Sequence, residues 1–365
     1  MKFEPDLPRN QGRLSATEKL MTLDSNLKLL MKNSGFLPVN NSIRPEIFNS
    51  SLIMMTTVNP IQSMRQAKHE AHIIRLRLLR KAALQRDLWW KFQASRTDYS
   101  YDSARHTAFY GNGSLDIPSS STFPVNHLMF ESTLPTDEHP APAPQRIFVL
   151  WTGDNEMSDN RKRSLDHLTE NFSAEVTLVT PSNLNEWVVS THPLHPAYEK
   201  LSLIHRSDYL RAYLAYHHGG GYVDLKSIRG DLGQLIGRIN SNPALWGGGM
   251  RELGSHNVGE ALGGSLPKEQ RVNHSRHLWA SCYAFRPKNR FTGEWLSEVE
   301  RRLSYFEPLL TQNPPMDPFG ASKGYPVPWF SILGNIFGPL CLKYQGHLTI
   351  DESLQWEPTN EASYR

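Results

Sequence analysis

Four charged residues in the middle of the chain have a spacing that suits a ligand site. Asp208 and Arg211 are three residues apart in a segment with helical spacing, so both side chains can point at the same ligand. Asp224 and Lys226 follow a short apolar run that reads as a strand. A protonated lysine can donate hydrogen bonds to phosphate oxygens as a point charge. Taken alone, the spacing of Asp208 and Arg211 favours an ion pair on a helix surface.

The elements that must position these residues are a helix, a glycine turn and a strand. Residues 206–218 predict the helix, with Ser207 or Asp208 as its cap. Glycines 219–221 stop that helix because glycine adopts backbone conformations closed to other residues. A buried strand begins at Tyr222, and ligands bind at the carboxyl ends of strands in α/β sheets. The apolar and aromatic positions of the helix are Leu210, Tyr213, Leu214 and Tyr216.

This stretch resembles the DXD-type sugar-nucleotide transferases of the GT-A fold. It is most similar to the capsular polysaccharide synthesis proteins, which are related to the clostridial glucosylating toxins and the initiating mannosyltransferases. The matching residues are Ser207, Asp208, Arg211, Tyr216, Gly219, Gly220, Tyr222 and Asp224, with Gly221 at the variable position. Lys226 departs from the pattern, because the family has a second aspartate there.

The resemblance implies an α/β protein of the GT-A fold, a Rossmann-like mixed sheet flanked by helices, here with an N-terminal helical appendage. It implies a glycosyltransferase that moves a sugar from a nucleotide-sugar donor, with a UDP-sugar favoured. The acceptor would be a saccharide or lipid-linked saccharide in capsule or other surface-polysaccharide biosynthesis. Two alternatives stay open: a toxin-like effector that glycosylates a protein, and a catalytically inactive relative that binds sugars or nucleotides.

The resemblance also implies which residues bind the donor. Asp208 and Arg211 would hold hydroxyls of the donor sugar, and Trp151 would stack on the base; a core tryptophan at a strand end is the alternative interpretation of Trp151. A C-terminal segment would close over the diphosphate through Trp329 and Asn335. The remaining donor-binding positions are Tyr216, Gly220, Gly221, Tyr222, Asp224 and Lys226.

The residue types at positions 224 and 226 bear on whether the donor diphosphate binds through a divalent metal ion. In the family, the two aspartates bind the donor and a divalent Mn²⁺ or Mg²⁺ ion that bridges the diphosphate. A protonated lysine cannot ligate that ion. Either Lys226 supplies the positive charge itself, or Asp224 holds a metal with a distant ligand, for which His347 and Asp351 are candidates. On the acceptor side, Glu252 is the candidate carboxylate, and only an inverting transfer would need it as a base.

Length and composition allow one large α/β domain with additional elements. The chain has 365 residues, 39% of them hydrophobic, and its net charge of +3 does not indicate a nucleic-acid partner. Two cysteines argue against a disulfide framework. The sequence lacks a signal-peptide pattern and a run of about 20 apolar residues, so we expect a cytoplasmic protein, with peripheral contact at the inner membrane face as an option.

The domain organisation follows from composition. Residues 1–110 are an appendage, 111–145 a linker or strap rich in proline and serine, 146–350 the catalytic domain and 351–365 a tail. A strongly basic helix is predicted over 62–96. Its role stays open between packing on the catalytic domain, contact with an anionic membrane or lipid-linked acceptor, and a groove for an anionic polymer.

Periodicity predicts the other elements. Strands are expected at 146–153, 175–181 and 278–285, and residues 244–252 are expected to be a strand that opens into a glycine loop. Helices are expected at 15–32, 158–171, 183–189 and 291–306, and a last one from Pro328.

Overall fold

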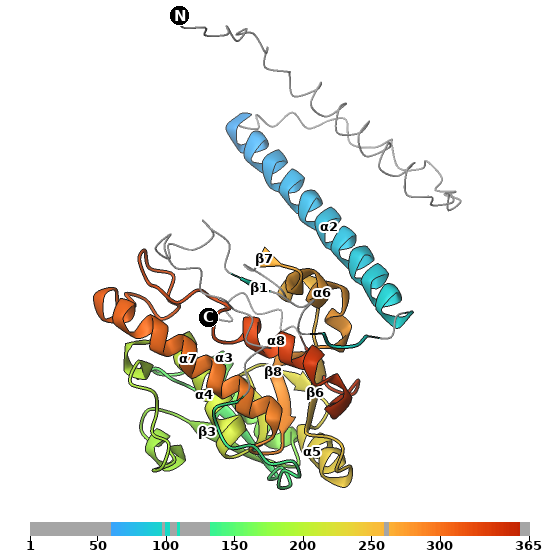
Figure 1. The fold of residues 1–365 in the computed structure, drawn as a ribbon. Helices are drawn as coiled ribbons and strands as arrows, with labels where there is room; N and C mark the ends of the chain where they lie inside the picture. Colours follow the sequence, from blue (N-terminus) through green and yellow to red (C-terminus); the bar gives the residue numbers. More distant parts are fainter. Residues whose placement is uncertain (1–59, 97–98, 103–107, 110–131, 259–262, 358–365) are drawn as a thin grey trace, which may run out of the picture. The chain divides into compact units, whose positions relative to one another are not determined.

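The computed structural model describes residues 60–96, 99–102, 108–109, 132–258 and 263–357 (Figure 1). The chain divides into two compact units, residues 1–70 and 71–365. The sheet and the helices that pack on it all belong to the second unit. The helix predicted at 15–32 and the first part of the predicted linker, 111–131, lie outside the described residues.

A six-stranded sheet forms the centre of the second unit, with strand order β3-β2-β4-β8-β6-β9. Five strands run in one direction and β8 runs against them. This confirms a mixed α/β architecture with a mainly parallel sheet. The strands are β2 (Arg146–Leu150), β3 (Glu175–Val179), β4 (Gly220–Val223), β6 (Gly247–Arg251), β8 (Leu278–Phe285) and β9 (Leu348–Ile350).

Helices cover both faces of this sheet. In β2, Ile147 and Val149 pack into one apolar cluster while Phe148 and Leu150 pack into the other, because alternate residues of a strand point to opposite faces. The first cluster includes residues of α3 (Asp159–Asn171) and α5 (Leu232–Ser241). The second includes residues of α4 (Leu203–His217), α7 (Arg290–Gln312) and α8 (Gly334–Lys343). The strands are therefore apolar on both sides, as the sequence indicated.

Helix α4 leads directly into β4, but it begins earlier than predicted. Its cap is Ser202, whose hydroxyl accepts a hydrogen bond from the backbone N–H of His205, so the predicted cap at Ser207 or Asp208 is wrong. Gly219 and Gly220 turn the chain with φ values of 65° and 82°. A Cβ at Gly220 would lie 2.5 Å from the carbonyl oxygen of Arg146. Gly220 therefore permits both the turn and the close approach of β2.

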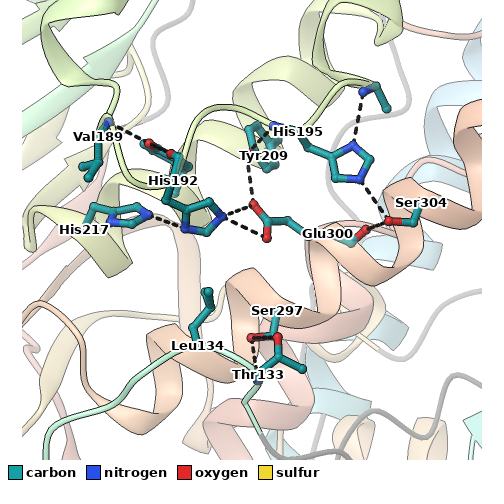
Figure 2. Close-up of polar contacts among 12 residues, drawn as sticks. Thr133, Leu134, Val189, His192, His195, Tyr209, His217, Ser297, Glu300 and Ser304 are labelled. Atoms are coloured by element: carbon teal, nitrogen blue, oxygen red, sulfur yellow. Dashed lines mark hydrogen bonds and ion pairs between the residues drawn. The ribbon is translucent and has the colours of Figure 1, made fainter.

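A polar network joins α4 to α7 next to this turn (Figure 2). The Tyr209 hydroxyl donates to Glu300 Oε1 at 3.1 Å, and it accepts a hydrogen bond from the backbone N–H of His195. His192 Nε2 lies 3.0 Å from the same Glu300 oxygen, and the other ring nitrogen lies 2.9 Å from His217 Nε2. The loop that precedes α4 is thereby held on the face of α7.

The end of the predicted linker packs on the sheet domain. The backbone N–H of Thr133 donates to the Ser297 hydroxyl of α7 (Figure 2). The Tyr216 hydroxyl donates to the carbonyl of Pro135, and the buried Arg286 donates to the carbonyl of Pro140 at 3.1 Å. Residues 132–145 are therefore a strap along the domain.

Most predicted elements are confirmed, and two are wrong. The strand at 278–285 and the helix at 158–171 agree with β8 and α3. The helix predicted at 183–189 is only a 3-10 turn at Leu184–Trp187. The last helix begins at Gly334, because the residues after Pro328 form turns.

The remaining elements lie around the edges of the sheet. Part of the predicted C-terminal tail belongs to the domain, because β10 (Gln355–Trp356) pairs with β5 (Ile228–Arg229). A second small sheet joins β1 (Ala108–Phe109) to β7 (Gly263–Gly264), and α6 (Leu266–Val272) follows β7.

The predicted basic helix is confirmed as α2 (Pro60–Ser95). Among the described residues, no helix has the length and apolar character needed to cross a membrane.

Candidate functional site

The sequence-predicted group meets at the carboxyl end of β4. Strands β2 and β4 are parallel neighbours, with Phe148 paired to Tyr222. Trp151 and Asp224 directly follow the last residues of these two strands, so they emerge at the same edge of the sheet. The backbone N–H of Asp224 continues the pairing with β8 by donating to the carbonyl of Ser281 at 3.0 Å. This is the edge at which α/β sheets bind ligands.

Asp224 is the centre of an ionic cluster. Arg211 Nη2 donates to Asp224 Oδ1 at 3.0 Å, and the Tyr222 hydroxyl donates to the same oxygen at 2.7 Å. Lys226 Nζ lies 2.7 Å from Asp224 Oδ2. On the far side of the arginine, Arg211 Nη1 lies 3.8 Å from Asp208 Oδ1. The helix α4 and the strand β4 thus bring together residues that are 18 positions apart in the chain.

Burial divides this cluster into an inner and an outer part. The side chains of Asp208 and Arg211 are only 5% and 11% exposed, whereas those of Asp224 and Lys226 are 17% and 19% exposed. Arg211 therefore contacts Asp224 from the more buried side of the cluster. Asp224 and Lys226 are the members closer to solvent.

The environment shifts the two carboxyl groups in opposite directions. Burial raises the pKa of Asp208 to about 7, although the charge of Arg211 partly offsets it. Burial alone would also raise the pKa of Asp224. Arg211 and Lys226 overcome that effect and hold the pKa of Asp224 well below its usual range. At neutral pH, Asp224 is ionised and Asp208 is near its midpoint.

Aromatic rings hold both cations in place. The guanidinium of Arg211 lies 4.6 Å from the ring centroid of Tyr222. Lys226 Nζ lies 4.6 Å from the ring centroid of Trp279 on β8. Such contacts attract each cation to the face of its aromatic ring. Both positively charged side chains, Arg211 and Lys226, are therefore held at the carboxyl end of β4.

These residues do not fit a divalent metal ion. A metal ligand needs carboxylate oxygens that face the ion, but both oxygens of Asp224 already accept from, or pair with, donor groups. Lys226 is a cation next to this carboxylate, so its charge would repel a metal ion. No group of three or more His, Cys, Asp and Glu side chains within the described ranges is arranged to hold a metal.

Trp151 follows β2 at the same edge of the sheet, and its side chain packs against the apolar cluster that includes residues of α3 and α5. It is half-buried, and its ring N–H donates to the carbonyl of Asn155 at 2.8 Å. The neighbouring Thr152 hydroxyl donates to the carbonyl of Leu203, the first residue of α4. This ties the end of β2 to the helix that carries Asp208 and Arg211.

Glu252 lies within electrostatic range of Lys226. Its buried carboxylate accepts hydrogen bonds from the backbone N–H of Leu253 and from the Asn257 amide at 2.7 Å. Burial raises its pKa, whereas these hydrogen bonds and the charge of Lys226 act in the opposite direction. A carboxyl group with a raised pKa, close to the cluster, suits a proton acceptor.

His347 and Asp351 are not brought to Asp224. The His347 ring stacks on Trp246 with centroids 3.8 Å apart. Trp246 precedes Gly247, the first residue of β6. Gly247 and Gly220, the first residue of β4, both pair with Phe285 of β8, so Trp246 lies at the edge of the sheet where β4 begins. His347 therefore lies at the opposite edge of the sheet from Asp224. Asp351 is engaged by Arg238 of α5. We do not carry either residue into the proposed site.

Three predicted donor-binding residues serve the packing of the core. The Tyr216 hydroxyl is bonded to the strap. Gly220 lies at the start of β4, against the first residue of β2. A Cβ at Gly221 would meet Leu232 and Ile147 side chains at 2.8 Å and 3.0 Å. The glycines are thus needed for close packing of the sheet and α5.

The two C-terminal candidates differ in exposure. Trp329 is 49% exposed, and Asn335 is buried on the first turn of α8. The segment that contains Trp329 is anchored by Arg302 of α7, which donates to the carbonyl of Ser331. The ring of Tyr325 stacks on His205 of α4, one turn before Asp208. This segment therefore lies against the buried side of α4.

Sequence reasoning missed the contributions of β8. Tyr283 pairs with Tyr222 across the sheet and is fully buried, and Trp279 contacts Lys226. Nothing in the spacing around these residues marks them, because they become neighbours of the cluster only through strand pairing.

A small cavity beside Arg211 is lined by Tyr222 and Tyr283 but not by Trp151, Asp208 or Asp224.

Comparisons of the chain with protein-family models, with curated proteins and with solved structures give no match.

Proposed function

We propose that this chain is a nucleotide-sugar-dependent glycosyltransferase of the GT-A fold that acts in capsule or other surface-polysaccharide biosynthesis. The observation that supports the proposal is the cluster at the end of β4. There, a carboxylate and two fixed cations stand at the edge where α/β sheets bind ligands. A nucleoside diphosphate has the negative charge and the hydroxyl groups that such a cluster would recognise.

In this proposal, Lys226 takes the place of the metal ion. Its ammonium group is held by Asp224 and Trp279 at the outer side of the cluster, where a diphosphate would meet it. A lysine donates to phosphate oxygens as a compact positive charge. It would stabilise the charge that grows on the leaving nucleoside diphosphate. The donor, a UDP-sugar, would therefore bind without Mn²⁺ or Mg²⁺.

The other residues have supporting roles. Asp224 holds the Lys226 ammonium group in place, and Arg211 acts as a positioning residue because it fixes the Asp224 carboxylate. Asp208 in turn faces Arg211. Trp151, at the end of the neighbouring strand, offers an aromatic face for the base, a contact worth about 1–3 kcal/mol.

Sugar transfer exchanges one bond of the anomeric carbon for another. The bond between the anomeric carbon and the phosphate oxygen breaks, and its electron pair leaves with the nucleoside diphosphate. The acceptor hydroxyl oxygen forms the new bond to that carbon and loses its proton. Glu252, with its raised pKa, is the candidate base if the anomer is inverted.

The burial of Asp208 and Arg211 favours a second candidate function. A donor sugar cannot touch these side chains unless their neighbours move. A relative that has lost transfer activity would still bind a nucleotide at Asp224 and Lys226. Binding without turnover is the behaviour that would distinguish it from the enzyme.

The test is a thermal-shift panel followed by a turnover assay. We expect UDP to raise the melting temperature more than GDP or CMP, with or without EDTA. Incubation with UDP-sugars should then release UDP, slowly without an acceptor and faster with one. A melting temperature that no nucleotide changes would overturn the proposal, and a UDP shift without UDP release would support the inactive relative.

A further inference from the structure

Helix α2 presents a large exposed surface over residues 71–92. In this span, every side chain is exposed or half-buried, and the first fully buried residue is Ala94. Contacts with the sheet domain are made near the end of the helix, where Asp87 accepts from the Ser255 hydroxyl and Arg276 donates to the carbonyl of Ala94. Most apolar side chains of this span are therefore left exposed by the described part of the sheet domain.

The exposed apolar residues form a stripe along this helix. At 3.6 residues per turn, five of them fall within about 100° of arc. They are Ile74, Leu78, Leu88, Trp89 and Phe92, and they are between 51% and 67% exposed. Three further exposed leucines, Leu76, Leu79 and Leu84, lie outside the stripe. Apolar area of this extent on one helix face marks an interaction surface.

Basic side chains border the stripe on both sides. Arg75 and Arg86 lie along one border, and Arg77 and Lys91 lie along the other. Lys81 lies within the stripe, and its long stem can carry the ammonium group past the apolar surface to lipid headgroups. Residues 71–96 contain seven arginine and lysine residues and one acidic residue. The charge of this surface is complementary to an anionic one.

We infer that helix α2 binds the surface of an anionic lipid bilayer. The apolar stripe enters the headgroup boundary, and the bordering arginines and lysines contact the phosphate groups. Trp89 and Phe92 are the kinds of side chain that anchor a helix at that depth. This inference does not depend on the proposed enzymatic function, because none of the residues that carry it belongs to the cluster at β4.

The test is flotation of the full chain with two kinds of vesicle. One is made of phosphatidylcholine alone and the other of equal parts phosphatidylcholine and phosphatidylglycerol. We expect flotation only with the second kind, and loss of flotation at high salt because screening weakens surface charge interactions. Arg75→Gln/Arg77→Gln should weaken the vesicle affinity about 30-fold, at about fivefold for each basic residue.

Leu88→Ser/Phe92→Ser tests the apolar stripe and should also weaken flotation. Two matched controls should float like the wild type: Met316→Ser/Phe319→Ser removes exposed apolar residues elsewhere, and Lys268→Gln/Lys323→Gln removes exposed charges elsewhere. Unchanged melting temperatures would show that the variants are folded.

Two results would overturn the inference. The first is a wild type that stays with the lipid-free fraction at low salt. If that protein is a dimer in sedimentation velocity and Leu88→Ser/Phe92→Ser makes it monomeric, the stripe binds a second copy. The second is a pair of α2 variants that float as well as the wild type.

Discussion

Lys226 and Asp224 form an ion pair across the end of β4, with Nζ 2.7 Å from Oδ2. The other oxygen of the same carboxylate accepts hydrogen bonds from Arg211 and Tyr222. Lys226 therefore completes the set of hydrogen-bond donors around the Asp224 carboxylate. The pair defines a site whose positive charge is carried by the protein itself.

Removing the Asp224 carboxylate should strongly destabilise the fold. Asp224→Ala leaves Arg211 buried without its closest ion-pair partner, and breaking a buried pair from one side costs about 3–5 kcal/mol. Urea unfolding measures this change in the free energy of unfolding. The control is Glu175→Ala, which removes a surface pair with Arg146 and should cost less than about 1 kcal/mol. A similar loss in the free energy of unfolding for both variants would contradict the burial of the pair between Arg211 and Asp224.

Asp208 should make stability depend on pH. Its folded pKa of about 7 lies above the unfolded value near 4, so the folded state binds the proton more tightly. Its contribution to stability is fully present below about pH 4 and is lost as the pH rises to about 7. Asp208→Asn cannot ionise. The free energy of unfolding of the variant should therefore rise relative to the wild type between pH 5 and pH 8.

The measurement is a pair of urea titrations for each protein, at those two pH values. Asp224 does not interfere, because its pKa is lowered and its contribution is complete above about pH 5. A constant difference between variant and wild type would mean that Asp208 is ionised over the whole range.

The sequence predicted this cluster better than it predicted the rest of the site. Asp208, Arg211, Asp224 and Lys226 were found because they lie in one helix–turn–strand unit, where local spacing fixes their geometry. Trp279 and Tyr283 were missed because they reach the cluster only through the pairing of β8 with β4.

The errors about the other residues have the same cause. The sequence allowed His347 as a distant metal ligand, but register places it at the opposite edge of the sheet. Tyr216 and Gly220 belong to the recognised motif, yet their contacts are with the strap and with β2. A motif identifies which residues matter without separating those that bind from those that pack.

The turn before β4 offers a test of that distinction. Gly220→Ala places a Cβ 2.5 Å from a backbone carbonyl at a φ of 82°, so we expect a loss of about 2 kcal/mol or more. Gly237→Ala is the matched control, because α5 has open space at that position and alanine favours helices by up to about 1 kcal/mol. Thermal unfolding of both variants measures the difference. A stable Gly220→Ala protein would show that the turn does not have this conformation.

The α4–α7 network should stabilise the fold through one hydroxyl. Tyr209→Phe removes the group that donates to Glu300 and accepts from the backbone N–H of His195 (Figure 2). Two partners lose a hydrogen bond in a buried region, so the expected loss is about 1–3 kcal/mol. Tyr198→Phe is the control, since its hydroxyl takes no part in the network of Figure 2. Equal melting temperatures for the two variants would contradict this account.

The most direct test of the central claim is calorimetric titration of UDP in the presence of EDTA. We predict that the wild type binds UDP under these conditions and that added Mn²⁺ does not tighten binding. Lys226→Gln should weaken binding at least about tenfold, as expected for a lost charged hydrogen bond of about 1.5–3 kcal/mol. Arg229→Gln, a change at an exposed arginine beyond the strand, should bind like the wild type. UDP binding that appears only after Mn²⁺ is added, or that survives unchanged in Lys226→Gln, would contradict the account.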